Sequence, residues 1–121
     1  MPVERLGIVG AETMGGGRAG GVFSRIFAMI VNEATFALMD SVASPADSDT
    51  ALRLGANYPQ GPLALADAIG LDVILQILEA LQRESGEERY RAPLLRMMIA
   101  AGWTGRAAGR GFFTYETGQN A

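Results

Sequence analysis

The stretch from residue 22 to residue 39 constrains the fold of this chain more than any other. Apolar side chains recur in it at intervals of three and four residues, which predicts a helix of about five turns with a wide apolar face. Such a face needs cover from several elements, and in a small domain part of that cover can come from a second copy of the chain. Arg25, Asn32 and Glu33 interrupt the apolar run. A membrane span needs about 20 mostly apolar residues, so we expect a core helix and no membrane partner.

Proline, glycine and capping residues predict four further helices. Ser44 can cap a helix that begins at Pro45, and Asp47 places a carboxylate near the positive end of that helix. Asp72 is expected to cap another helix, which Gly86 ends. The four expected helices span residues 45–54, 62–69, 73–84 and 93–101. With the long first helix they predict an all-α fold of five helices, followed by a glycine-containing aromatic tail that packs on the bundle in extended form.

The first 20 residues differ from the rest of the chain, so we divide it into a segment 1–20 and a helical domain 21–121. Residues 6–10 resemble a short strand. Five of the seven residues from 15 to 21 are glycine, which predicts a flexible segment.

Missing residue types exclude several kinds of site. The sequence contains no cysteine and no histidine, and all ten of its basic residues are arginine. Thiolate nucleophiles, the usual proton shuttle and Schiff-base lysines are therefore absent, and we expect neither a metal site nor a catalytic residue. The formal net charge of −3 argues against a nucleic-acid partner. The run Gly10-Ala11-Glu12-Thr13-Met14-Gly15 approaches a dinucleotide fingerprint, but Glu12 puts a negative charge where the phosphates would lie, so we expect no cofactor site in this chain.

Three motifs together are similar to those of a known family. They are Ser44-Pro45-Ala46-Asp47, the turn Asn57-Tyr58-Pro59-Gln60-Gly61-Pro62 with the helix that follows it to Asp67, and Gly109-Arg110-Gly111-Phe112-Phe113. Over roughly residues 20–116 the chain resembles the C-terminal helical domain of the 3-hydroxyacyl-CoA dehydrogenases. Residues 86–91 look most like the distal copy of this domain in long bacterial hydroxyacyl-CoA dehydrogenases. The resemblance implies a bundle like the C-terminal domain of 6-phosphogluconate dehydrogenase, with one long first helix.

The resemblance also implies a function. Enzymes of this family oxidise (3S)-3-hydroxyacyl-CoA to 3-ketoacyl-CoA with NAD, as in fatty-acid β-oxidation. Their Rossmann domain supplies the cofactor site and a catalytic His–Glu pair, while the helical domain dimerises and closes over the acyl-CoA. We therefore expect a cytoplasmic, homodimeric, substrate-side domain that is not catalytic by itself. It would handle acyl-CoA beside a separate Rossmann partner and meet NAD only through that partner.

The family pattern and the arginines indicate candidate site residues. The family places an active-site Asn directly before an Arg early in the first helix, and here Ser24 precedes Arg25. The resemblance places four residues of the proline-rich turn near the substrate as well: Asn57, Pro59, Gly61 and Pro62. Arg106 and Arg110 flank a glycine-rich turn, where their planar donors could contact a CoA phosphate or simply face solvent.

Departures from the family pattern support an alternative. Ser24 replaces the Asn, Ala107-Ala108 stands where the family usually has Lys-Thr, and Phe113 stands where Tyr is common. Polar groups that would touch substrate are thus lost while packing residues remain. The alternative is a homodimeric interaction module that has lost acyl-CoA binding. An independent enzyme using only Asp, Glu and Arg has no paired-carboxylate spacing to support it.

Three further residues are expected to be structural. Glu33 lies on the long apolar helix, where an ion pair with an arginine is a more frequent role than general base. Asp67 could tie the proline-rich turn or cap the helix end near Gly70. Trp103 is expected to anchor the core or an interface.

Overall fold

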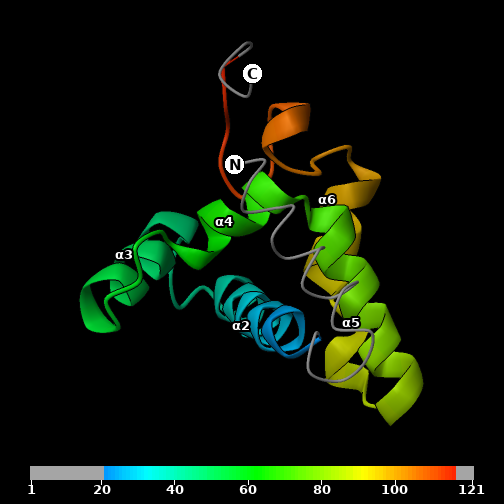
Figure 1. Ribbon diagram of the computed structural model, residues 1–121. Helices are drawn as coiled ribbons and strands as arrows, with labels where there is room; N and C mark the ends of the chain where they lie inside the picture. Colours follow the sequence, from blue (N-terminus) through cyan, green and yellow to red (C-terminus); the bar gives the residue numbers. More distant parts are fainter. Residues whose placement is uncertain (1–20, 117–121) are drawn as a thin grey trace.

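The computed structural model describes residues 21–116 (Figure 1). The elements in order are α2 (Val22–Met39), α3 (Pro45–Gly55), α4 (Pro62–Ile69), α5 (Leu71–Ser85), η1 (Glu88–Arg91), α6 (Pro93–Ala100) and η2 (Arg106–Ala108). Within residues 21–116, five α-helices and two short 3-10 helices confirm the all-α prediction. The strand expected at residues 6–10 and the dinucleotide-like run at 10–15 lie outside the described residues.

Local signals set most helix ends where the sequence predicts them. Ser44 Oγ accepts a hydrogen bond from Asp47 N at 3.1 Å, and Pro45 is the first residue of α3. Gly86 ends α5 in the left-handed conformation, with φ at 75°. A residue with a Cβ is disfavoured at this angle, which is why the glycine marks the helix end so clearly.

Four helix ends differ from the prediction by one or two residues, and two of these are small extensions: α3 ends at Gly55 and α5 at Ser85, each one residue later than expected. Asp72 does not cap α5, because the helix already begins at Leu71 and no side chain caps it. The Leu71 N–H instead donates to the Thr104 carbonyl at 2.8 Å, so a distant part of the chain satisfies a group that local capping would have served. At the other end of the domain, α6 stops at Ala100 rather than continuing to residue 101.

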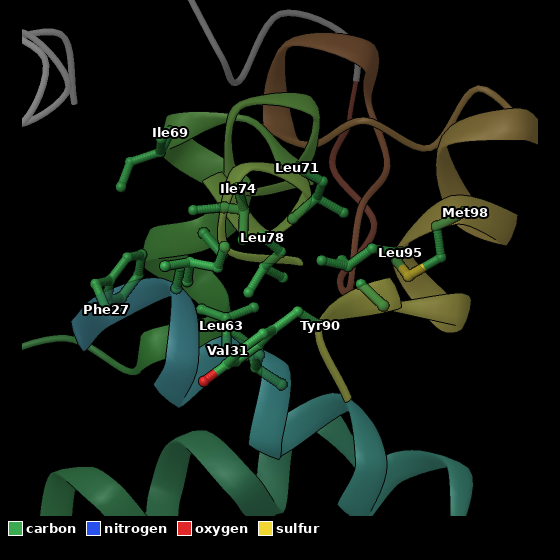
Figure 2. Packing of buried hydrophobic residues seen from close by; sticks show 14 residues of the cluster. Phe27, Val31, Leu63, Ile69, Leu71, Ile74, Leu78, Tyr90, Leu95 and Met98 are labelled. Carbon is green, nitrogen blue, oxygen red and sulfur yellow. The ribbon is translucent and has the colours of Figure 1, made fainter. Parts of the chain in front are cut away.

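The core forms where α2 meets α4, α5 and α6. Figure 2 shows side chains from all four helices converging, with Tyr90 of η1 among them. The buried apolar residues are Phe27, Ala28, Val31, Leu63, Ala66, Ile69, Leu71, Ile74, Leu78, Leu81, Tyr90, Ala92, Leu95 and Met98. Burying one Leu, Ile or Phe side chain stabilises a fold by about 1.5–3 kcal/mol, so this cluster is the main source of the domain's stability.

Only one face of α2 lies in the core. Phe27 and Val31 are buried there, whereas Val22, Phe23 and Ile26 are 51%, 49% and 55% exposed. By length and composition alone α2 could cross a membrane, and 33% of that 18-residue window is buried within the domain. The prediction of a core helix is therefore confirmed for one face, and the other face remains open at its N-terminal half.

The tail packs on the bundle as expected, but its shape differs from the expected extended segment. Isolated antiparallel bridges pair Gly105 with Arg110 and Arg110 with Thr114. They fold residues 105–114 into a hook, which contains η2 (Arg106–Ala108). Gly105 and Gly109 take positive φ angles of 133° and 84°, which turn the chain back on itself. The aromatic side chains of the hook pack against the core.

Candidate functional site

An apolar groove runs between the N-terminal half of α2 and the loop that leads into α4. Its volume is about 730 Å³. It is lined by Phe23, Ile26, Phe27, Ile30, Tyr58, Pro59, Gln60, Pro62 and Leu65. Only two of these side chains carry a polar group, the Tyr58 hydroxyl and the Gln60 amide. The rings of Phe23 and Phe27 stack with their centroids 5.8 Å apart and form part of the floor. The groove suits an apolar chain or an apolar partner surface, not a charged group.

Asp49 of α3 holds the loop that forms one wall of the groove. Its carboxylate accepts hydrogen bonds from Leu63 N at 2.8 Å and Ala64 N at 2.9 Å, and so caps the N-terminus of α4. Gly61 lies directly against this carboxylate, because a Cβ at that position would come within 2.2 Å of Asp49 Cγ. A side chain at position 61 would displace the cap and, with it, the groove wall.

The four residues predicted in this turn have different places. Pro59 and Pro62 line the groove. Gly61 packs on Asp49 behind it, and Asn57 turns the chain into the loop with a positive φ of 62°. Asparagine tolerates this left-handed conformation better than most residues, so Asn57 shapes the loop through its backbone. The structure thus brings two of the four to the groove surface and gives the other two roles in building it.

Neither Ser24 nor Arg25 lines the groove. Ser24 is 2% exposed, and its Oγ has no hydrogen-bond partner in the described part of the chain. Arg25 is exposed and borders a neighbouring hollow of about 400 Å³, beside Met29 and Glu33. A substrate-proximal role for this pair stays a prediction.

Glu33 makes the structural contact that the sequence suggested. It forms an ion pair with Arg89 of η1, and both side chains are largely exposed. The neighbouring Asn32 is buried and donates through Nδ2 to the Arg89 carbonyl at 2.8 Å. The guanidinium of Arg89 also lies over the Phe36 ring, 5.7 Å from its centroid. These contacts attach η1 to α2, and nothing in them resembles an activated base.

Asp67 of α4 binds the tail through hydrogen bonds to residues 112, 113 and 115. Its buried carboxylate accepts hydrogen bonds from Phe112 N at 2.8 Å, Phe113 N at 3.0 Å and the Tyr115 hydroxyl at 2.7 Å. A Cβ at Gly111 would lie 2.1 Å from Asp67 Oδ1, so only glycine lets the tail approach this closely. Burial raises the pKa of the Asp67 carboxyl, although its hydrogen bonds oppose the shift. Burial and the bond to Asp67 also raise the pKa of the Tyr115 hydroxyl, which keeps it a donor.

Sequence reasoning missed what the two buried carboxylates bind. The structural role of Asp67 is confirmed, but both expected partners, the proline-rich turn and the helix end near Gly70, are wrong. Its partners lie 45–48 residues further along the chain. No role was predicted for Asp49, because its partners are 14 and 15 residues away and most of α3 is exposed. No local sequence pattern indicates either contact.

The two candidate phosphate-binding arginines stack on separate aromatic rings in the tail. The Arg106 guanidinium lies 5.5 Å from the centroid of the Tyr115 ring, and that of Arg110 lies 3.6 Å from the centroid of the Trp103 ring. Neither residue lines the groove. Trp103 packs against the core, as expected. Contact with CoA phosphate stays a prediction for both arginines.

Within residues 21–116 no group of three His, Cys, Asp or Glu side chains is placed to hold a metal ion.

Comparison with known proteins identifies the family. The family model for the C-terminal domain of 3-hydroxyacyl-CoA dehydrogenase matches residues 20–115. The chain belongs to this family. It is 47% identical over 98 residues to a probable 3-hydroxybutyryl-CoA dehydrogenase of Bacillus subtilis strain 168, and the matched stretch covers 80% of this chain and 34% of the relative. It is 58% identical over 67 residues to the 3-hydroxyadipyl-CoA dehydrogenase of Escherichia coli strain K12, and the matched stretch covers 55% of this chain and 14% of that protein.

A solved structure agrees with the sequence comparison. The fold is similar to the crystal structure of (S)-3-hydroxybutyryl-CoA dehydrogenase PaaH1 from Ralstonia eutropha, with a TM-score of 0.70 and 47% identity over 76% of this chain and 32% of that one. The resemblance drawn from the three motifs is therefore confirmed, as is the helical fold it implied. The chain spans about a third of the length of the Bacillus relative and of the Ralstonia enzyme.

Proposed function

We propose that this chain is the substrate-side and dimerisation domain of an NAD-dependent 3-hydroxyacyl-CoA dehydrogenase. It would work beside a Rossmann-fold partner that supplies NAD and the proton-transferring residues, in fatty-acid oxidation in the bacterial cytoplasm. The observation that carries this proposal is the apolar groove between α2 and the loop into α4, in a domain of this family. An acyl chain is the part of an acyl-CoA substrate that such a groove would shelter from water.

The chemistry of the groove supports a role that is not catalytic by itself. Oxidising a 3-hydroxyl group to a ketone requires a base to take the hydroxyl proton and an acceptor to take the hydride. The groove wall offers only a phenol and an amide as polar groups, and the whole sequence lacks histidine, lysine and cysteine. We therefore expect the proton-transferring group to come from a partner of this chain.

The open face of α2 supports association with a second protein surface. Val22, Phe23 and Ile26 are each about half exposed, and Phe23 and Ile26 also line the groove. Contiguous exposed apolar patches on soluble proteins often mark sites of protein–protein contact. A second copy of the chain or the Rossmann partner would bury it.

A calorimetric titration with acetoacetyl-CoA, with and without NADH, tests the proposal. We expect saturable binding that does not depend on NADH. Replacing Ile26 with Gln should weaken it about tenfold, since the polar amide would enter the groove. The Leu54→Gln variant is the matched control, because Leu54 is 78% exposed and lies outside the groove. Robust NAD-linked turnover by the purified chain would refute the non-catalytic assignment.

One observation favours the alternative of an interaction module that has lost acyl-CoA binding. None of the polar residues expected near the substrate lines the groove: Ser24, at the position of the family's active-site Asn, is buried, and Arg106 and Arg110 stack on aromatic rings. If no acyl-CoA binds while light scattering gives the mass of two chains, this alternative replaces the main proposal. A mass of one chain at high micromolar concentration would refute dimerisation in both.

A further inference from the structure

A second hollow lies at the opposite end of α2 from the groove. The C-terminus of α2, the loop that follows it, α6 and the tail hook surround a volume of about 580 Å³. Its apolar walls come from Leu38, Met39, Leu94, Met98, Trp103 and Phe112. No residue is shared between this hollow and the groove. The volume falls within the range of about 300–1,000 Å³ that small-molecule sites occupy, and the hollow is open to solvent on one side, where Arg110 is exposed.

One cation marks the wall of this hollow. The Arg110 guanidinium lies against the indole of Trp103, 3.6 Å from the ring centroid. This distance is well within cation–π range, so the ring fixes the guanidinium while leaving the N–H groups along its edge able to donate. The backbone of Arg110 is held as well, since it exchanges hydrogen bonds with Gly105 at 2.8 and 3.1 Å.

The charge around Arg110 is unbalanced. No acidic residue lines the hollow, and Arg110 forms no ion pair with any carboxylate within residues 21–116. Asp40 is close in sequence to the lining residues, but it lines a different hollow, beside Arg89 and Arg91. The polar side chains that remain in the lining are the hydroxyls of Ser41 and Ser44. An apolar pocket with a single fixed guanidinium has the chemistry of a site for an apolar molecule with one carboxylate.

We propose that this hollow, which we call the Arg110 pocket, binds a small amphiphilic carboxylate. The ligand places its apolar body between α2 and α6 and its carboxylate on the edge of the Arg110 guanidinium. Met39 and Met98 adapt to bodies of different shape, because a methionine side chain has three rotatable bonds and no branch. This site is separate from the groove and does not depend on the dehydrogenase role proposed for it.

Trp103 is the only tryptophan in the sequence and lines the pocket, so its fluorescence reports binding there directly. The experiment titrates the chain with octanoate and, separately, with 1-octanol, which has the same apolar body without the charge. We expect a saturable change in Trp103 emission with octanoate, and binding of 1-octanol weaker by at least about tenfold, as loss of a charge-assisted pair implies.

Variants locate the site. Arg110→Gln should weaken octanoate binding by about tenfold or more and bring it to the level of 1-octanol. Arg106→Gln is the matched control, because Arg106 stacks on Tyr115 outside the pocket and should leave the affinity unchanged. Ile26→Gln should also leave it unchanged, which separates this pocket from the groove.

Three results would overturn the proposal: equal affinity for octanoate and 1-octanol, the same loss of affinity in the Arg106 and Arg110 variants, or no saturable change in emission. Circular dichroism checks that each variant is folded. If Arg110→Gln does not fold, the comparison of octanoate with 1-octanol on the wild-type chain still decides the question.

Discussion

Replacing Asp67 with Asn should destabilise the domain by about 2–3 kcal/mol. The carboxylate accepts three hydrogen bonds, from the N–H groups of Phe112 and Phe113 and from the Tyr115 hydroxyl. Asn has the same shape but only one acceptor oxygen, and its amide nitrogen would face a second backbone N–H. The Tyr115 hydroxyl can rotate and accept a hydrogen bond from that amide nitrogen, but a backbone N–H can only donate and would face another donor. One buried donor is thus left unpaired, which costs about 1–3 kcal/mol, and the remaining bonds lose their charge assistance.

Urea denaturation followed by Trp103 fluorescence and by circular dichroism measures this change. A domain of this size loses about 1–2 kcal/mol of unfolding free energy per molar urea, so a loss of about 2–3 kcal/mol should lower the midpoint by about 1–3 M. Asp72→Asn is the control, because Asp72 is exposed in the first turn of α5, and its effect should stay below about 0.5 kcal/mol. A change of less than about 0.5 kcal/mol for Asp67→Asn would show that the hydrogen bonds between Asp67 and the tail do not stabilise the fold.

The same pair of proteins tests the pKa of Asp67. Because burial raises it above the ordinary value of 3.8, the folded state holds this proton to higher pH than the unfolded state does. The stability due to this proton is fully present below the unfolded pKa and is lost as pH rises through the folded one. The advantage of the wild type over Asp67→Asn should therefore be larger near pH 4 than at pH 7. An advantage that grows with pH would mean that the hydrogen bonds outweigh burial.

Two further variants test the groove wall and the attachment of η1. Gly61→Ala should cost about 1–3 kcal/mol of unfolding free energy, since its Cβ would come within 2.2 Å of Asp49 Cγ, whereas Gly55→Ala, with nothing within 4 Å, should change stability by less than about 1 kcal/mol. Thermal unfolding compares the two alanine variants, and equal effects would contradict the steric explanation. Glu33→Gln should cost less than about 1 kcal/mol, because the ion pair with Arg89 is largely exposed, and the cost should shrink further in 0.5 M salt. A larger loss that persists in salt would point to a role for Glu33 beyond this pair.

The sequence predicts the helices well because their ends depend on neighbouring residues. Ser44 and Pro45 begin α3, and Gly86 ends α5, through backbone geometry that only nearby atoms influence. The one wrong cap shows where this reasoning stops. The N–H of Leu71 finds its acceptor in Thr104, which no local pattern reveals.

The candidate site was predictable only in part. The proline-rich turn is recognisable as a motif, and two of its residues do line the groove. The direction of Ser24 was not predictable, because which face of α2 turns inward depends on where α4, α5 and α6 pack. The Arg110 pocket draws its walls from three segments far apart in the chain, so the sequence could suggest an anion site at Arg110 but not the apolar hollow beside it.

The sequence by itself determined the all-α class, most helix ends, the family and the absence of histidine, lysine and cysteine chemistry, because composition and local backbone preferences carry all of these. Only the tertiary structure decided what Asp49 and Asp67 bind, which face of α2 stays open and where the two hollows lie. The physical reason is range. A cap or a left-handed glycine acts within a few residues, whereas a buried carboxylate must find its donors wherever packing brings them, here up to 48 residues away.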